Sequence, residues 1–202
     1  MIIIVDYGLG NIRAFLNAFK LLNIQVRTAQ TAEELSDATK IILPGVGAFD
    51  HAMERLDESG MRGTLDELVL DRRVPVLGVC VGMQMLGASS EEGERAGLGW
   101  VAGRVRKLHA LNSDLRLPHM GWNDVRPTEG VELFEGLEND ARFYFLHSFY
   151  FACERTENVA AVANYGAEFS CAVRAANIYG VQFHPEKSHH CGTRLLQNFA
   201  AI

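Results

Sequence analysis

The sequence predicts an α/β protein with an open, mostly parallel central sheet that is flanked by helices and joined to a smaller antiparallel β layer. In the first half, short apolar runs typical of buried strands alternate with segments whose apolar residues recur at helical spacing. In the second half, strand-like runs follow one another with turn residues between them. Alternating strands and helices imply right-handed crossovers between parallel strands, whereas consecutive strands favour antiparallel pairing.

The first half contains four predicted strands and their connecting helices. Residues 2–6 (IIIVD) form a continuous apolar run, as in a parallel strand that is covered on both faces. Thr31 with Glu34, and Thr64 with Glu67, have the spacing of capping boxes that open helices. The predicted strands are 2–6, 24–28, 40–45 and 74–79, and the predicted helices are 12–22, a short helix after Thr31, 49–56, 65–70 and 81–86.

The second half is expected to extend the sheet, to build the antiparallel layer and to end in a helix. That helix spans about residues 188–200, with Leu195, Leu196 and Phe199 facing inward. Because no repeats, linkers or low-complexity tracts occur, we expect residues 1–202 to form a single domain. The strand-like segments are 98–108, 142–151, 159–165, 169–175 and 178–184.

Composition excludes several classes of function. The 202 residues are 48% hydrophobic and 22% charged, which is ordinary for a globular protein. A net charge of -6 without a basic run argues against a nucleic-acid partner. The amino-terminal stretch MIIIVDYG is too short in apolar residues for an export signal or a membrane span, so we expect a cytoplasmic protein that does not bind membranes.

Cys80 is the first candidate catalytic residue. It lies in Gly78-Val79-Cys80-Val81-Gly82, a G-x-C-x-G pattern that is the cysteine analogue of the G-x-S-x-G nucleophile elbow. At the start of a predicted helix, the helix dipole would favour the thiolate, and the Val81 N–H would face an oxyanion formed by attack on a carbonyl. The alternative is a buried cysteine on a glycine-rich turn.

His184 and Glu186, in GVQFHPEKS, are the candidate base and its orienting carboxylate. Residues two apart project to the same side of an extended segment, so Glu186 could hold the His184 ring. Both His184 and Cys80 would lie at the carboxyl ends of neighbouring parallel strands, where open sheets bind ligands. The alternatives are a surface pair, or a metal site with His189 and His190, for which no further ligand spacing is evident.

The segment LPGVGAF, residues 43–49, is the third candidate element. Gly45 and Gly47 follow a predicted strand and would let backbone N–H groups approach a ligand closely. Such groups could supply a second oxyanion donor beside Cys80. The alternative is a plain strand-ending turn.

These motifs together resemble the class I, triad-type glutamine amidotransferases, whose flavodoxin-like fold agrees with the predicted architecture. The resemblance rests on PGVG, GVCVGMQ and QFHPEKS. Further motifs are similar to those of the glutaminase subunits of imidazole glycerol phosphate synthases, and they span essentially the whole chain. These further motifs are DYGLGN (6–11), PHMGWN (118–123), FLHSFY (145–150) and RLLQNF (194–199).

The resemblance implies a glutaminase that needs no cofactor and no metal. Cys80 would attack the side-chain amide of glutamine, His184 would shuttle protons, and Glu186 would orient His184. The resemblance also assigns an oxyanion hole to Gly45 and Val46, with a peptide flip as one way to form it. Gln84 and the backbone of Ser148 and Phe149 would hold the amino-acid end of glutamine. Many relatives have tyrosine where this chain has Phe149, which would preserve a backbone contact but remove a hydroxyl contact.

The resemblance further implies a heterodimer with a (β/α)8-barrel synthase subunit that receives the ammonia. Asn11, Trp122 and Lys187 match interface positions by the same resemblance. A helix-capping role for Asn11 and a solvated Lys187 are the alternatives. Residues 6–15 and 99–108 also resemble close paralogues that supply ammonia to a partner modifying a surface-polysaccharide sugar, and the sequence separates the two settings poorly.

Three rival functions are weaker. A stand-alone cysteine hydrolase would not need PGVG and HPE together, and a non-catalytic subunit would not need all three triad positions. A dinucleotide-binding loop at DYGLGN would use Gly8 and Gly10, but Arg13 replaces the third glycine of G-x-G-x-x-G.

Overall fold

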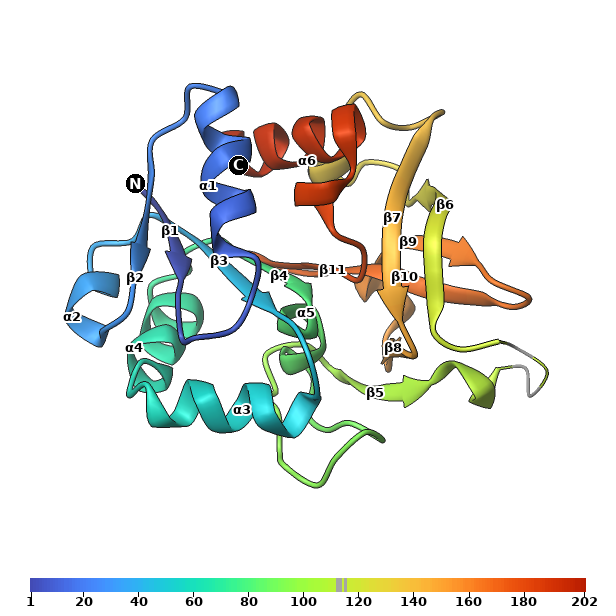
Figure 1. The fold of residues 1–202 in the computed structure, drawn as a ribbon, viewed down its shortest axis with the longest axis horizontal. Helices are drawn as coiled ribbons and strands as arrows, with labels where there is room; N and C mark the ends of the chain where they lie inside the picture. Colours follow the sequence, from blue (N-terminus) through green and yellow to red (C-terminus); the bar gives the residue numbers. More distant parts are fainter. Residues whose placement is uncertain (112–113, 115) are drawn as a thin grey trace.

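The computed structural model describes residues 1–111, 114 and 116–202, and within them the chain forms a nine-stranded sheet and a two-stranded sheet. The order in the large sheet is β2-β1-β3-β4-β11-β10-β9-β6-β7, and β5 pairs with β8 in the small sheet (Figure 1). The strands are β1 (Ile2–Val5), β2 (Val26–Ala29), β3 (Lys40–Gly45), β4 (Val76–Cys80), β5 (Gly103–Lys107), β6 (His119–Pro127), β7 (Ala141–His147), β8 (Phe149–Cys153), β9 (Val159–Asn164), β10 (Glu168–Ala175) and β11 (Ile178–Val181).

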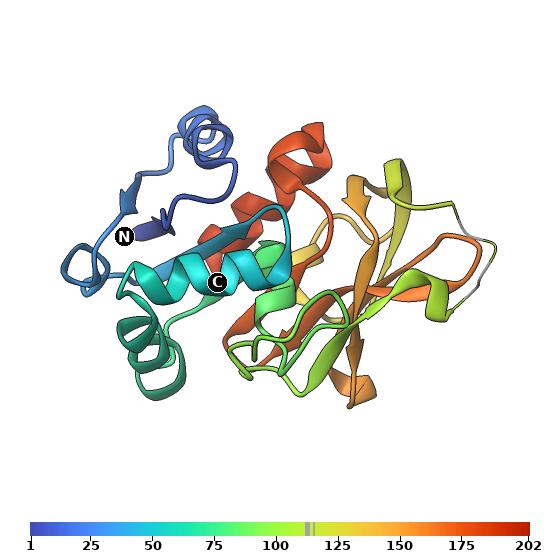
Figure 2. The ribbon, with the colours of Figure 1, turned by 60° about the horizontal axis from the view of Figure 1, so that its bottom comes forward.

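Helices cover both faces of the parallel half of the sheet, with α1 and α6 on one side and α3 and α4 on the other (Figures 1 and 2). Among the described residues, no helix combines the length and the apolar character needed to cross a bilayer. The α-helices are α1 (Ile12–Leu21), α2 (Ala32–Leu35), α3 (Phe49–Glu58), α4 (Arg62–Asp66), α5 (Val81–Met85) and α6 (His189–Ala201). The remaining turns are the π-helical η1 (Glu67–Asp71) and the 3-10 turns η2 (Leu108–Ala110), η3 (Glu132–Phe134), η4 (Thr156–Asn158) and η5 (Pro185–Lys187).

The predicted fold class is confirmed: β2, β1, β3, β4 and β11 run parallel, and the strands of the second half extend this sheet and form the antiparallel pair. Leu195, Leu196 and Phe199 of α6 are buried as expected. Four local predictions were wrong. Strand β6 was missed, residues 142–151 break at Ser148 into strands of two different sheets, residues 98–108 contain only the short strand β5, and α4 begins before Thr64 rather than at it.

The strand order brings the candidate motifs to one edge of the sheet. β4 lies between β3 and β11, with Gly45 paired to Cys80 and Val79 paired to Val181. Because all three strands are parallel, their carboxyl ends meet, and the segments that follow them converge there.

The turn from β4 into α5 depends on three glycines that permit close backbone contacts. A Cβ on Gly82 would lie 1.9 Å from the Leu43 carbonyl oxygen, and one on Gly45 would lie 2.4 Å from the Gly82 nitrogen. A Cβ on Gly78 would lie 2.7 Å from the Gly82 oxygen. These three glycines are therefore required for α5 to pack directly on β3 and β4.

We expect Gly82→Ala to destabilise the protein by about 3 kcal/mol or more, because the backbone of β3 cannot move without disturbing the sheet. Chemical denaturation would measure this change. Gly63→Ala in α4 is the matched control, since a Cβ there meets no atom within 4 Å, and it should be neutral or stabilising by up to about 1 kcal/mol. Equal effects of the two substitutions would contradict the close-packing explanation.

Candidate active site

Cys80 lies at the point where β4 turns into α5, in a backbone conformation that ordinary residues rarely adopt. Its φ is 56° and its ψ is -113°, and it occupies the N-cap position of α5. A positive φ at a non-glycine residue stores strain that is typical of functional sites. The side chain is 6% exposed, so the thiol is reached through a cavity and does not stand on the open surface. Since α5 spans only Val81–Met85, its dipole is smaller than that of a long helix.

Hydrogen bonds of the His184 backbone hold this residue against the edge strand β7. Its N–H donates to the Tyr144 carbonyl over 2.9 Å, and the Ser188 hydroxyl bridges the His184 carbonyl and the Tyr144 N–H at 2.6 and 3.0 Å. The imidazole Nδ1 lies 2.9 Å from Oε1 of Glu186. The sequence predicts that this pair forms along an extended segment. It forms instead across the η5 turn, in which Pro185 begins a 3-10 helix.

The His184 imidazole is strongly disposed to carry a proton. Burial opposes the charged form, but hydrogen bonds to Cys80 and Glu186 and attraction to both groups outweigh burial and raise the pKa of His184 to about 9. Cys80 and His184 line the same cavity, and the carboxylate of Glu186 stabilises the imidazolium. The second oxygen of Glu186, Oε2, is buried and has no hydrogen-bond partner among the described residues.

Gln182, which is not among the predicted site residues, contacts the Cys80 sulfur. Its Nε2 donates to Sγ of Cys80 over 3.8 Å, while its Oε1 accepts from Nε2 of Gln84 over 3.0 Å. Gln182 is fully buried. A glutamine directly after the apolar strand β11 was the available signal, because a buried amide needs hydrogen-bond partners.

A cavity of ≈ 220 Å³ joins most of the predicted site residues. This volume is below the roughly 300–1,000 Å³ of drug-sized ligand sites and suits a ligand as small as an amino acid. Gly45 does not line the cavity, although it is paired with Cys80 in the sheet. The lining residues are Val46, Gly47, Cys80, Val81, Gln84, Glu92, Leu146, His147, Ser148, Phe149, His184 and Lys187.

Glu92 places a carboxylate in this cavity and was also missed. Its Oε2 accepts from the backbone N–H of Phe49, the first residue of α3, over 2.8 Å. It lies in an acidic run, EEGE, whose composition is typical of a solvent-exposed loop. The neighbouring Glu91 does not line the cavity: its carboxylate accepts a hydrogen bond from the Lys107 N–H and pairs with Arg106.

Two of the predicted interface residues, Asn11 and Trp122, lie outside the cavity, whereas Lys187 lines it. Asn11 occupies the N-cap position of α1, but its side chain makes no capping hydrogen bond, so the helix-capping alternative is not favoured. Lys187 places its Nζ 5.8 Å from the centre of the Tyr144 ring. Trp122 is 43% exposed and contacts His189 edge-on.

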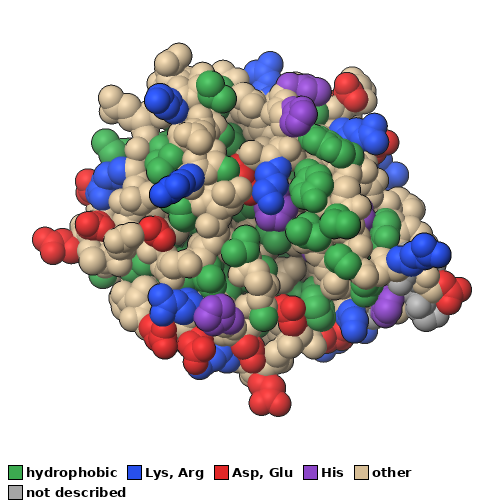
Figure 3. Space-filling model, in the orientation of Figure 1, with side chains coloured by type: hydrophobic (Ala, Val, Ile, Leu, Met, Phe, Trp, Pro, Cys, Tyr) green, Lys and Arg blue, Asp and Glu red, His purple; other side chains and the backbone are tan. Residues whose placement is uncertain are grey.

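Apolar side chains gather near the cavity and along the outer faces of β6 and β7. Met120 pairs with Leu146 across the two strands, and Trp122 pairs with Tyr144 two residues further on. Figure 3 shows hydrophobic side chains in the middle of this face of the molecule. We call Val46, Met120, Trp122 and Leu146, which are 37–65% exposed, the apolar patch.

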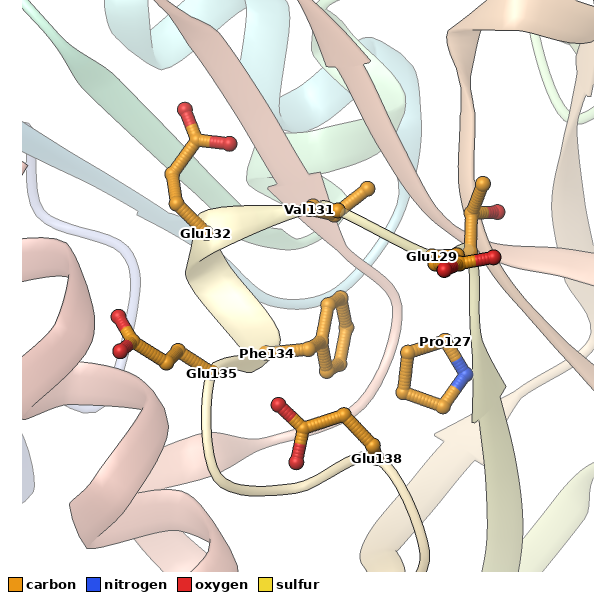
Figure 4. A pocket seen from close by; sticks show the side chains of 9 residues that line it. Pro127, Glu129, Val131, Glu132, Phe134, Glu135 and Glu138 are labelled. Atoms are coloured by element: carbon orange, nitrogen blue, oxygen red, sulfur yellow. The ribbon is translucent and has the colours of Figure 1, made fainter.

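Other candidate sites lack suitable chemistry. A cavity of ≈ 460 Å³ beside η3 has Pro127, Val131 and Phe134 at its wall and glutamates around it (Figure 4). Its lining contains no thiol or imidazole. Among the described residues no cluster of His, Cys, Asp or Glu could hold a metal ion. In the DYGLGN loop, Gly10 is explained by packing, since a Cβ there would lie 2.7 Å from Pro44.

Comparisons with known proteins agree on one family. The family model described as glutamine amidotransferase class-I matches residues 3–202. A Bdellovibrio bacteriovorus protein named imidazole glycerol phosphate synthase subunit HisH is 63% identical over the whole of both chains. Proteins of the same name from Leptospira borgpetersenii and, as HisH 2, from Pseudomonas aeruginosa are 52% and 43% identical over the whole of both chains.

Solved structures share the fold at low sequence identity. One described as a glutamine amidotransferase aligns with a TM-score of 0.77 at 22% identity, covering 98% of this chain and 97% of that chain. The PurLQS structure from Thermotoga maritima aligns with a TM-score of 0.77 at 17% identity, covering 99% of this chain and 97% of that chain.

The raised pKa of His184 predicts a pH-dependent contribution to stability. The folded protein binds the His184 proton more tightly than the unfolded chain, so this contribution is complete below the ordinary value of 6.5 and is lost as the pH rises through about 9. We expect the difference in unfolding free energy between the unaltered protein and His184→Gln to fall by at most about 3 kcal/mol between about pH 6 and pH 10. Denaturant titrations at several pH values would measure it, and a difference independent of pH would contradict it.

Proposed function

The chain belongs to the class-I glutamine amidotransferase family, and from that membership we propose that it is the glutaminase subunit of an imidazole glycerol phosphate synthase in histidine biosynthesis. We propose residues 1–202 as one amidotransferase domain. The observation that carries the catalytic part is that a strained Cys80 and a His184 held by Glu186 line the same cavity.

Cys80, His184 and Glu186 are the proposed catalytic triad. The Cys80 thiolate attacks the side-chain amide carbon of glutamine, and the carbonyl electrons move to oxygen. His184 then gives its proton to the amide nitrogen, the C–N bond breaks, ammonia leaves and a glutamyl thioester remains. Water attacks the thioester and gives a proton to His184 as the base. The C–S bond then breaks, which restores the Cys80 thiolate beside the protonated His184, and the new carboxyl group loses its proton to solvent as glutamate leaves. Glu186 stabilises the imidazolium and fixes its orientation.

The oxyanion of each tetrahedral intermediate is proposed to bind backbone N–H groups beside Cys80. Val81, directly after the nucleophile, lines the cavity and supplies one N–H. Gly45 and Val46 at the end of β3 are the proposed second source, and Val46 also lines the cavity. Donors fixed in advance stabilise developing charge without reorganisation, and one such donor is typically worth about 10²–10³ in rate.

Gln182 is proposed to assist the nucleophile, since its amide N–H is directed at Sγ. Because that N–H faces sulfur, its carbonyl oxygen must face Gln84, which donates to it. The Gln84 amide is thereby oriented with its own oxygen available to the cavity that it lines. Gln84 would then accept a hydrogen bond from glutamine.

The amino-acid end of glutamine is proposed to bind opposite these groups. The backbone of Ser148 and Phe149 offers polar groups to the α-carboxylate, and this contact is unaffected by the absence of a tyrosine hydroxyl at position 149. Glu92 supplies a negative charge within the same cavity for the α-ammonium group.

A (β/α)8-barrel synthase subunit is the proposed partner and the recipient of the ammonia. In neutral water ammonia is mostly protonated and then has no lone pair with which to attack, so a dry passage into the partner preserves the nucleophile. The apolar patch near the cavity is the proposed centre of the interface, with Asn11 and Lys187 as polar contacts. Exposed apolar surface of this kind favours a protein partner.

Removing the nucleophile tests the catalytic assignment in the assembled complex. Cys80→Ala should reduce glutamine-dependent synthesis by at least about a thousandfold and leave synthesis from added ammonium salts within about twofold. The isolated chain should release glutamate from glutamine slowly, and the ligand-bound barrel subunit should activate it. Cys153→Ala, which removes a half-buried thiol outside the cavity, should leave both activities unchanged. Loss of both activities in Cys80→Ala would show that Cys80 is structural.

Substitutions in the apolar patch test the interface. Trp122→Ala should weaken binding of the barrel subunit at least about tenfold, because large half-exposed aromatic residues commonly anchor interfaces. Calorimetric titration would measure the affinity. Leu21→Ala is the matched control, since Leu21 is 83% exposed at the far end of α1 and should have no effect. Equal effects of the two substitutions would contradict the interface.

A further inference from the structure

Two buried histidines face each other across β6 and β7 beside the cavity. His119 begins β6, His147 ends β7, and the two residues are direct cross-strand partners. Nδ1 of His119 lies 2.9 Å from Nε2 of His147, and Nδ1 of His147 lies 2.7 Å from the Phe149 carbonyl oxygen. Both side chains are less than 10% exposed.

The hydrogen bonds of this pair have one consistent direction. A carbonyl oxygen only accepts, so Nδ1 of His147 carries the proton, and its Nε2 accepts from Nδ1 of His119. Nε2 of His119 is then an acceptor and lies 3.3 Å from Nδ2 of Asn123. The other Asn123 amide proton is donated to the Asn164 carbonyl over 2.8 Å. Donation therefore runs from Asn123 through His119 and His147 to Phe149.

The surroundings keep both rings neutral and fixed. Burial lowers the pKa of His119 to about 4. Burial also lowers the pKa of His147 to about 3, outweighing the hydrogen bond to the Phe149 carbonyl, which raises it. His119 is stacked between Phe145 and Tyr165, at 4.8 and 4.2 Å between ring centres. A proton added to Nε2 of His147 would face the Nδ1–H donor of His119, and a proton added to Nε2 of His119 would face the Asn123 amide donor.

This chain of hydrogen bonds ends on the segment proposed to hold glutamine. The Ser148 carbonyl accepts from the Leu108 N–H over 3.0 Å. Since the two groups of a trans peptide point in opposite directions, the Phe149 N–H points away from Leu108. The Phe149 carbonyl, in the next peptide group, is held by His147. The two peptide groups that flank the Cα of Phe149 are therefore both anchored, and Phe149 lines the cavity.

We propose that His119 and His147 are positioning residues that hold the Phe149 backbone so that its N–H binds the α-carboxylate of glutamine. The proposal rests on the proposed glutaminase function. Neither histidine reacts: both act through the Phe149 peptide, so they govern recognition of the amino-acid end and not the reactivity of Cys80.

Two alkylating reagents separate these roles in the isolated chain. The diazoketone analogue of glutamine carries the amino-acid end and labels Cys80 after binding, whereas iodoacetamide labels the thiol without that end. In His147→Phe, which keeps an aromatic ring but removes the donor, the half-saturating concentration of the analogue should rise about 5- to 10-fold, as expected for one lost hydrogen bond. The maximal labelling rate and the iodoacetamide rate should stay within about twofold.

His147→Asn is the conservative rescue, because an asparagine amide can occupy the place of Nδ1 and donate to the Phe149 carbonyl. It should restore most of the affinity for the analogue. If His147→Phe does not fold, His119→Phe carries the test: it keeps the stacked ring, removes only the donor to His147 and should shift the half-saturating concentration about 2- to 5-fold.

Two results would overturn the proposal: equal weakening by His147→Phe and His147→Asn, or a parallel fall in the iodoacetamide rate, since either would mean that the histidines serve only packing. Failure of the proposed function would be visible separately. Labelling of the unaltered protein by the analogue would then not saturate, and both proposals would fall.

Discussion

The arrangement of the site depends on how closely the backbone of β3 approaches the first turn of α5. Gly82 lies against the Leu43 carbonyl and Gly45 lies against Gly82, at distances that leave no room for a side chain. This contact forces the chain to turn sharply at Cys80, which adopts its strained φ as a consequence. The same turn places the thiol at the ends of β3 and β11, so the proposed nucleophile, the proposed oxyanion donors and His184 are brought together by one packing constraint.

The buried polar groups are organised as two directional chains of hydrogen bonds. One runs from Gln84 through Gln182 to the Cys80 sulfur, and the other runs from His119 through His147 to the Phe149 carbonyl. In a low-dielectric interior, reversing one member of such a chain leaves an unpaired donor or acceptor, which costs more than the bond contributes. Each chain of hydrogen bonds therefore fixes one end of the cavity. The first fixes the proposed reacting end, and the second fixes the proposed binding site for the amino-acid end of glutamine.

The sequence predicts the parallel half of the fold and the Cys80, His184 and Glu186 candidates because their signals are local. Apolar runs specify buried strands, and the glycines around Cys80 specify a tight turn. Strand β6 was missed because its inward positions carry the polar residues His119 and Asn123. Their remaining hydrogen-bond partners, His147 and the Asn164 carbonyl, come from β7 and β9. Gln182 and Glu92 were missed for a related reason, since their partners lie 102 and 43 residues away in the chain.

Strand β7 connects the proposed interface to the proposed base. It is the last strand of the large sheet, and an uncovered edge would expose unpaired backbone groups. At Tyr144 those groups are paired with Ser188 and His184, so the segment that carries the base completes the edge. The outward side chains of β7 include Leu146 of the apolar patch, while the inward ones include His147. A partner that packs on this strand would therefore contact the element on which both the proposed base and the proposed substrate-binding peptide are fixed, which gives assembly a direct physical route to the proposed reactive centre.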